Sequence, residues 1–204
     1  MKKRKQKFSL RRKYLESFKF IKESLNYILS VFALFVLFFA MGFILPYVAE
    51  PSVLDQIMKI VEEWVKEILE QTEGLGFFGM WEFILFNNGL VALLSIFSGF
   101  LLGIIPALLL FSNGLVIGII SAIAFSVEGS SSFLKLLPHG IFEIPAIIIS
   151  LAIGIKNASF LFAKNPRKRF AYLMKNSFWT FLLVVLPLLI IASLIEAFLI
   201  VSLG

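Results

Sequence analysis

Cysteine is absent from the 204 residues, and histidine occurs once, at His139. Without cysteine the chain can form neither a disulfide framework nor a thiolate zinc site, and it has no thiol nucleophile. A single histidine cannot build a histidine-rich metal centre within one chain, and no Ser–His–Asp or Ser–Lys pairing is recognisable. We therefore expect no cofactor, no metal and no enzymatic activity.

Apolar residues, by contrast, are abundant: 59% of the residues are hydrophobic and 24 are phenylalanine. A soluble domain of this size could not bury so much apolar surface, so the composition predicts an all-α, polytopic membrane protein. The net charge of +6 would suit nucleic acid. The basic residues, however, form two blocks beside hydrophobic segments, which is the orientation signal of membrane proteins, and we expect no nucleic-acid partner.

Five segments are long enough to cross a bilayer core of about 30 Å as helices. We expect these transmembrane spans, within one domain that covers residues 25–204, at residues 25–48, 81–103, 104–127, 137–162 and 177–203. Residues 128–135 are expected to form a polar outer loop. Residues 1–24 form a basic arm, which either touches anionic lipid head groups, partly as an amphipathic helix, or docks a cytoplasmic partner. A second basic block at residues 164–175 follows the fourth span, so the positive-inside rule puts the N-terminus in the cytoplasm.

Residues 52–73 differ from the spans because their apolar residues follow one helical face and charged residues fill the other. Between residues 55 and 73, six acids and two lysines give a net charge of −4. We expect an amphipathic helix on the outer side. It either rests on lipid or on its own protein, or binds a membrane or extracytoplasmic protein partner.

Small residues recur every four positions on three of the spans, a spacing that lets helix backbones approach closely in lipid. A tight turn is expected at Gly103. The same faces could serve one bundle or join copies of the chain as a homo-oligomer. The glycines predicted to pack helices are Gly99, Gly103, Gly114, Gly118 and Gly154.

Several polar side chains lie inside the spans: Asn87, Asn88, Asn113, His139, Glu143 and Glu196. Polar groups in lipid are costly unless they face protein or water, so we expect them to form one cluster. Asn113 is expected deeper than the others, which belong to the outer half of the bilayer. Residues 86–91 and 111–116 share the pattern Phe-x-Asn-Gly-Leu-Val. This is either an inverted repeat with helices broken at Asn-Gly, as in transporters, or a coincidence of biased composition.

His139 and Glu143 share one helix face, and Pro145 predicts a kink one turn further on. Three roles for the cluster remain open. It could be a structural network, a pathway for a proton, ion or small solute, or a metal-dependent intramembrane hydrolase. His139-x-x-x-Glu143 lacks the second histidine of the His-Glu-x-x-His protease helix.

At these residues the chain resembles the stage II sporulation protein M family of integral membrane proteins. The motifs that carry the resemblance are Phe86-x-Asn88, Gly99-x-x-x-Gly103, Asn113-Gly114-x-x-x-Gly118 and Leu137-Pro138-His139-Gly140-x-x-Glu143. The resemblance implies a component of a membrane complex. The founding member acts with peptidoglycan-degrading proteins during engulfment and is not itself the hydrolase.

The function expected from the sequence is a non-enzymatic subunit or scaffold of a complex in a prokaryotic cell membrane. The alternative is a small channel or transporter for protons, ions or a small solute that uses the polar cluster.

Overall fold

The computed structural model describes residues 9–203, with all side chains except those of residues 132–139 and Leu203. Throughout this part the regular structure is helical and contains no strand, so the all-α prediction is confirmed. The elements are α1 (Leu10–Glu23), α2 (Leu25–Val48), α3 (Pro51–Thr72), α4 (Phe77–Phe97), α5 (Ile104–Glu128), α6 (Ser131–Asn157), a 3-10 turn (Ala158–Phe162), α7 (Pro166–Thr180), a π-helical segment (Phe181–Val185) and α8 (Leu186–Leu203).

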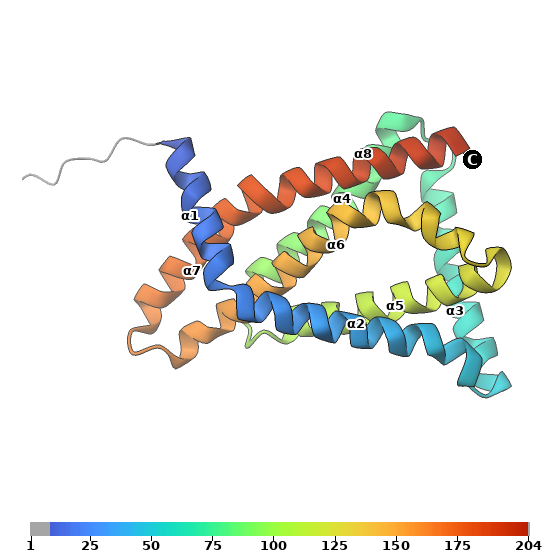
Figure 1. Cartoon of the computed structure of the whole chain (residues 1–204), viewed down its shortest axis with the longest axis horizontal. Helices are drawn as coiled ribbons and strands as arrows, with labels where there is room; N and C mark the ends of the chain where they lie inside the picture. Colours follow the sequence, from blue (N-terminus) through green and yellow to red (C-terminus); the bar gives the residue numbers. More distant parts are fainter. Residues whose placement is uncertain (1–8, 204) are drawn as a thin grey trace, which may run out of the picture.

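Five helical segments are long and apolar enough to cross a membrane, as predicted. They are Leu25–Val48, Phe77–Phe97, Ile104–Glu128, Gly140–Phe162 and Pro166–Ser202. In Figure 1 these spans run along the long axis of the bundle, and α3 lies across one end of it. The fold is therefore a helical membrane bundle with two helices, α1 and α3, outside the set of spans.

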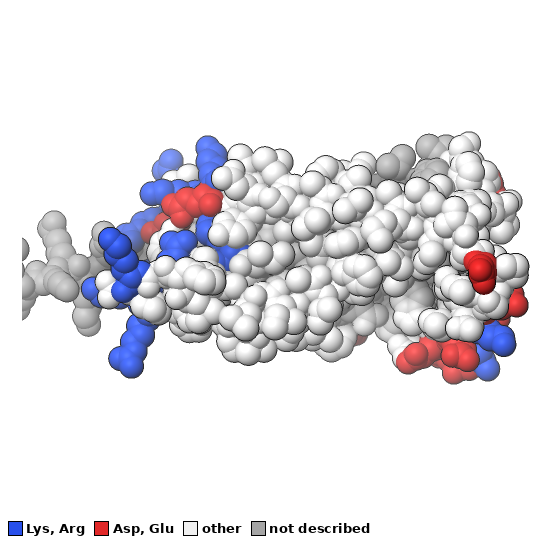
Figure 2. Space-filling view, turned by 90° about the horizontal axis from the view of Figure 1, so that it is seen from below, with Lys and Arg blue, Asp and Glu red and all other residues white. Residues whose placement is uncertain are grey.

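Charges divide between the two ends of this bundle. Figure 2 shows most Lys and Arg at one end, most acids at the other, and a broad, largely uncharged band between them. The basic end contains α1 and α7, and the acidic end contains α3 and the C-terminus (Figure 1). The positive-inside rule assigns the basic end to the cytoplasm and the acidic end to the outside.

Helix α6 is the centre of the bundle. It packs against α2, α4, α5 and α8, and Leu151, Ala152 and Ile153 are completely buried in the core. Figure 1 shows α6 changing direction partway along its length. Pro145 supplies the cause, because proline removes a backbone donor and crowds the preceding turn.

Several predicted boundaries are wrong. Helix α4 covers Phe77–Phe97 rather than residues 81–103, and α6 begins at Ser131, so most of the predicted loop 128–135 is helix. Gly129 ends α5 with a left-handed φ of 66°, and the Ser131 hydroxyl donates to the Glu128 carbonyl at 2.6 Å. These two features let the chain reverse within two residues.

The last span also begins earlier than residue 177, since α7, the π-helical segment and α8 form one continuous helix from Pro166. The π-helical turn, Phe181–Val185, ends two residues before Pro187. Proline cannot donate a backbone hydrogen bond to the preceding turn, and a widened turn relieves its clash with that turn.

Four of the five predicted packing glycines lie at contacts between helices of this chain. A Cβ on Gly99 would collide with the Gly154 carbonyl, so Gly99 lets the turn after α4 approach α6 closely. A Cβ on Gly118 would collide with the Phe39 carbonyl, and one on Gly114 would lie 2.8 Å from the Cβ atom of Phe38, which joins α5 to α2.

Gly103 has a different role from the other four glycines. Its φ of 71° is left-handed, so it closes the turn between α4 and α5. The sequence analysis missed Gly42, whose Cβ would collide with the Leu115 carbonyl and which therefore fixes the close approach of α2 to α5.

Candidate functional site

A small cavity lies between α2, α4, α5 and α6, with a volume of about 30 Å³. Three of its lining residues are polar, and each comes from a different helix: Asn88 from α4, Asn113 from α5 and Glu143 from α6. The other lining residues are apolar: Phe35, Val91, Ile117, Ile144, Ile147 and Ile148. The cavity is therefore a small polar site with mostly hydrocarbon walls.

Asn88 and Asn113 hold the same position in the two Phe-x-Asn-Gly-Leu-Val motifs, and both line this cavity. The motifs therefore meet in space from two consecutive helices. Both α4 and α5 continue through their Asn-Gly steps, so the alternative in which the helices are broken there is wrong. The asparagine side chains, rather than freed backbone groups, supply the polarity.

The expectation that Asn113 lies deeper than Asn88 is also wrong. Asn88 lies nine residues before the end of α4 at Phe97, and Asn113 lies nine residues after the start of α5 at Ile104. At a rise of 1.5 Å per residue, each is roughly 14 Å from the cytoplasmic end of its helix. The two side chains therefore share one height near the middle of the bundle.

Two of the other predicted site residues, Asn87 and Glu196, are not among the side chains that line the cavity. Asn87, next to Asn88, is exposed, and Glu196 is half-buried on α8. The side chain of His139 lies outside the described residues. Of the five predicted site residues whose side chains the structure describes, it thus brings three together.

The orientation of the Asn113 amide follows from its hydrogen bond. Its Nδ2 atom donates to the backbone carbonyl of Leu109, one turn earlier in α5, at 2.8 Å. Only the nitrogen of an amide can donate to a carbonyl, so the Oδ1 atom is the end directed away from this bond. With a carboxylate and a second amide nearby, the cavity can offer oxygen atoms to a water molecule, a proton or a cation.

A second polar group, which the sequence analysis missed, lies at the cytoplasmic end of the core. The Lys156 side chain is buried, and its Nζ atom lies 2.8 Å from Ser24 Oγ and 4.0 Å from the centre of the Phe20 ring. The Ser24 hydroxyl in turn donates to the Phe20 carbonyl at 2.7 Å. Lys156 therefore ties α6 to the junction between α1 and α2.

Asn157, the next residue, is completely buried and joins three helices. Its Nδ2 atom donates to the Ile96 carbonyl at 2.8 Å and lies 3.2 Å from the Ser177 hydroxyl, which also lies 3.2 Å from Asn157 Oδ1. A signal for both residues is present in the sequence. Six residues separate Asn157 from the basic block at Lys164, so Lys156 and Asn157 belong to the fourth membrane span and not to the basic segment that follows it.

Among the described side chains, no three His, Asp or Glu residues gather closely enough to hold a metal ion. No curated protein and no solved structure matches the chain. The model of the family described as "Stage II sporulation protein M" matches residues 31–199, which is most of the chain and includes the cavity, Lys156, Asn157 and α3. The chain is therefore an integral membrane protein that belongs to the stage II sporulation protein M family.

Proposed function

We propose that the protein is a non-enzymatic subunit or scaffold of a complex in a prokaryotic cell membrane. In this proposal, helix α3 presents the surface on which an extracytoplasmic protein partner docks. The observation that carries the proposal is the position of α3, which is an amphipathic helix outside the packed core.

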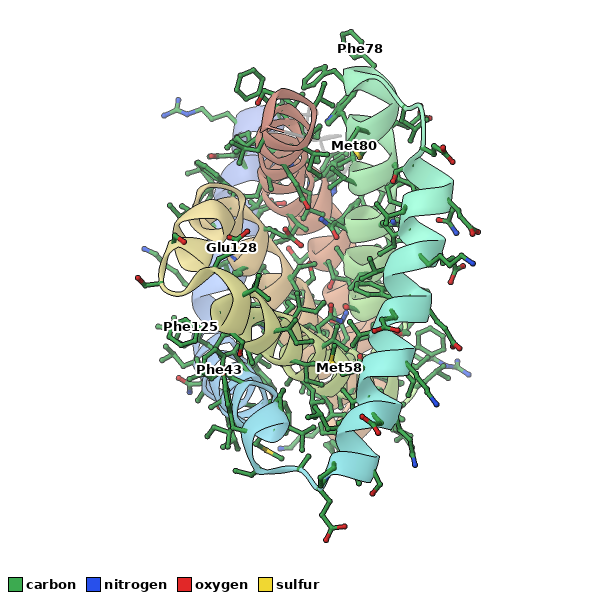
Figure 3. All side chains as sticks on the ribbon, turned by 90° about the vertical axis from the view of Figure 1, so that its right-hand side faces the viewer. Phe43, Met58, Phe78, Met80, Phe125 and Glu128 are labelled. Carbon is green, nitrogen blue, oxygen red and sulfur yellow. The ribbon has the colours of Figure 1, made fainter. Side chains whose placement is uncertain are left out.

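Helix α3 has no buried residue, although one of its faces is apolar. Seen from the acidic end, it runs along one edge of the bundle, and Met58 extends from it toward the spans (Figure 3). Ile57, Val61 and Ile68 are half-buried in the middle of the apolar face. This geometry supports an apolar face turned toward bundle and lipid, and a charged face turned outward.

The charged face is acidic and open to solvent. It contains Asp55, Glu62, Glu63, Glu67, Glu70 and Glu73 beside Lys59 and Lys66, and all are exposed. Lys66 and Glu70 lie 3.8 Å apart, and an exposed pair of this kind contributes at most about 1 kcal/mol. The net charge of −4 fits a partner with a basic surface, because complementary potentials guide association.

Photo-crosslinking in cells tests this proposal. A crosslinking amino acid at Glu63 or Glu67 should capture a discrete protein partner, and the same group at Val36, exposed on α2 within the membrane, should not. In membranes, adduct formation should fall as salt is raised, since charges on the two surfaces are screened beyond a Debye length of about 10 Å at 0.1 M salt. Absence of any adduct from both α3 positions would contradict the proposal.

The cavity favours one second candidate, a small channel or transporter for protons, ions or a small solute. Its support is the meeting of Asn88, Asn113 and Glu143 at one height inside the bundle. Purified protein in liposomes should then show flux that Glu143→Gln abolishes and Glu196→Gln leaves intact. Equal flux in liposomes with and without the protein would remove this candidate.

A further inference from the structure

We propose that a groove between α1 and the last membrane span binds one anionic phospholipid of the cytoplasmic leaflet. In this proposal Arg11 holds the phosphate of the head group, and an acyl chain lies against the span. The groove is open to the surface and has a volume of about 310 Å³, whereas the internal cavity has about 30 Å³. Its lining residues are Leu10, Arg11 and Tyr14 of α1, Leu182 and Leu183 of the π-helical segment, and Pro187 of α8.

The groove lies where α1 meets the irregular part of the last span. Helix α1 packs against α7 and the π-helical segment, and Figure 1 shows it crossing the basic end of the bundle steeply to the spans. The Nζ atom of Lys13 lies 5.6 Å from the centre of the Trp179 ring, two residues before the π-helical segment. Tryptophan is enriched at membrane interfaces, which places this contact at the level of the cytoplasmic head groups. π-Helical turns are rare and often occur at functional sites.

The walls of the groove extend from that level into the hydrocarbon region. Leu182 and Pro187 follow Trp179 by three and eight residues, which is roughly 5 and 12 Å toward the bilayer centre at 1.5 Å per residue. The side chains of Leu10 and Leu182 remain 58% and 39% exposed. Lipid chains are the natural neighbours of exposed leucines at this depth, so the groove spans the two chemical regions that a phospholipid occupies.

Arg11 supplies the contact for the head group. It is exposed and is the one charged residue among the described residues that line the groove. The next two basic side chains, Arg12 and Lys13, hydrogen-bond Glu16 at 2.8 and 2.7 Å, so they are held on another part of α1. A guanidinium group can bind phosphate oxygens through two parallel hydrogen bonds, which makes arginine a suitable residue for this contact.

The charge around the groove favours an anionic over a zwitterionic lipid. Helix α1 contains five basic and two acidic residues, and residues 164–175 contain five basic residues and no acid. Together these segments carry a net charge of +8 at the cytoplasmic end of the bundle. Basic clusters at this position attract anionic lipids, whereas the positive group of a zwitterionic lipid would be repelled.

The experiment follows thermal unfolding of the full chain in detergent micelles that contain phosphatidylglycerol, phosphatidylcholine or soluble glycerol phosphate. Phosphatidylglycerol should raise the transition temperature saturably, because a ligand that binds only the folded state stabilises it by mass action. Phosphatidylcholine lacks the net negative charge and glycerol phosphate lacks acyl chains, so both should raise it far less. Native mass spectrometry should retain one phosphatidylglycerol per chain. No shift with phosphatidylglycerol, or an equal shift with either comparison compound, would overturn the inference.

Two matched pairs of variants locate the lipid. Arg11→Gln should weaken phosphatidylglycerol binding by about tenfold or more, since a charge-assisted contact is lost. Lys19→Gln removes the same charge from the same helix outside the groove and should have a much smaller effect. Leu10→Ala should weaken binding by about threefold or more through lost apolar contact. Leu15→Ala is its control, because Leu15 is 60% exposed on α1 but does not line the groove.

All four substituted positions are exposed, so the variants should fold and each comparison can be made. Equal weakening within either pair would show that lipid is attracted to α1 as a whole and would overturn the inference. The result does not depend on a partner at α3, because α1 and α3 lie at opposite ends of the bundle (Figure 1).

Discussion

The Nζ atom of Lys156 lies 2.8 Å from the Oγ atom of Ser24, although 132 positions separate the two residues. Both side chains are buried, so the ammonium group depends on this hydroxyl and on the face of the Phe20 ring, 4.0 Å away. A buried charge is tolerated only where neighbouring groups replace the water it has lost. The contact thus links the position of α1 to the core of the membrane bundle.

Removing the hydroxyl should therefore cost more than removing both partners. Ser24→Ala leaves the buried ammonium without its hydrogen-bond acceptor, and we expect a loss of about 1–3 kcal/mol in the free energy of unfolding. Lys156→Met in the same background should restore most of that loss, because an apolar side chain then fills the space. Reversible unfolding in mixed detergent micelles measures both. A double variant less stable than Ser24→Ala would contradict this account.

Replacing Asn157 should lower the stability of the cytoplasmic end of the bundle, because its side chain joins three helices. Asn157→Leu leaves the Ile96 carbonyl and the Ser177 hydroxyl without their partner, which should cost about 1–3 kcal/mol for a buried unsatisfied group. Asn176→Leu is the matched control, because the hydrogen bond of Asn176 goes to the Tyr172 carbonyl of its own helix. The control should change the free energy of unfolding by less than about 0.5 kcal/mol. If the two variants lose a similar free energy of unfolding, the contacts of Asn157 with the other two helices do not stabilise the protein in the way inferred here.

Helix α1 contains a carboxylate whose titration can be predicted. Lys13 and Arg12 hydrogen-bond Glu16 at 2.7 and 2.8 Å and lower its pKa from 4.5 to about 2. Because the folded pKa is depressed, the pairing stabilises α1 fully above pH 4.5, and the benefit is lost as pH falls toward 2. A carboxyl NMR titration should show the low midpoint. Lys13→Met should raise it more than Arg12→Met, since Lys13 is the larger cause of the shift.

The spans could be predicted because length and hydropathy largely determine them. Residues 25–48 match α2 at both ends. Other helix ends differ from the predicted ones because local backbone features determine them. An example is the left-handed Gly129, which lets α6 begin at Ser131. The sequence thus predicts which segments cross the membrane better than where each helix starts.

The polar site could be predicted only in part, for a related reason. Polar groups in lipid must find each other, which indicated that Asn88, Asn113 and Glu143 would meet. Asn87 and Asn88 are adjacent on a span that is apolar all round, so its own pattern cannot show which of them faces the bundle. Packing against α5 and α6 decides that point. Lys156 was missed because a nearby basic block makes it resemble an interfacial lysine.

Close packing of α4 on α6 leads to a last prediction. Replacing glycine by alanine should destabilise the protein at position 154 of α6 but not at position 140. A Cβ on Gly154 would collide with the Ser95 carbonyl, and the obstacle is backbone that cannot rotate away. Gly154→Ala should therefore force α4 and α6 apart and cost about 1–3 kcal/mol, the usual range for overpacking a core.

Gly140→Ala is the matched control in the same helix. Its Cβ would lie 3.6 Å from the Ile144 Cδ1 atom, an ordinary contact, so the variant should be neutral or more stable by up to about 1 kcal/mol, the helix preference of alanine over glycine. Unfolding of the two variants under identical detergent conditions measures the difference. If Gly154→Ala is as stable as Gly140→Ala, α4 and α6 do not approach as closely in the membrane as the glycine contact requires.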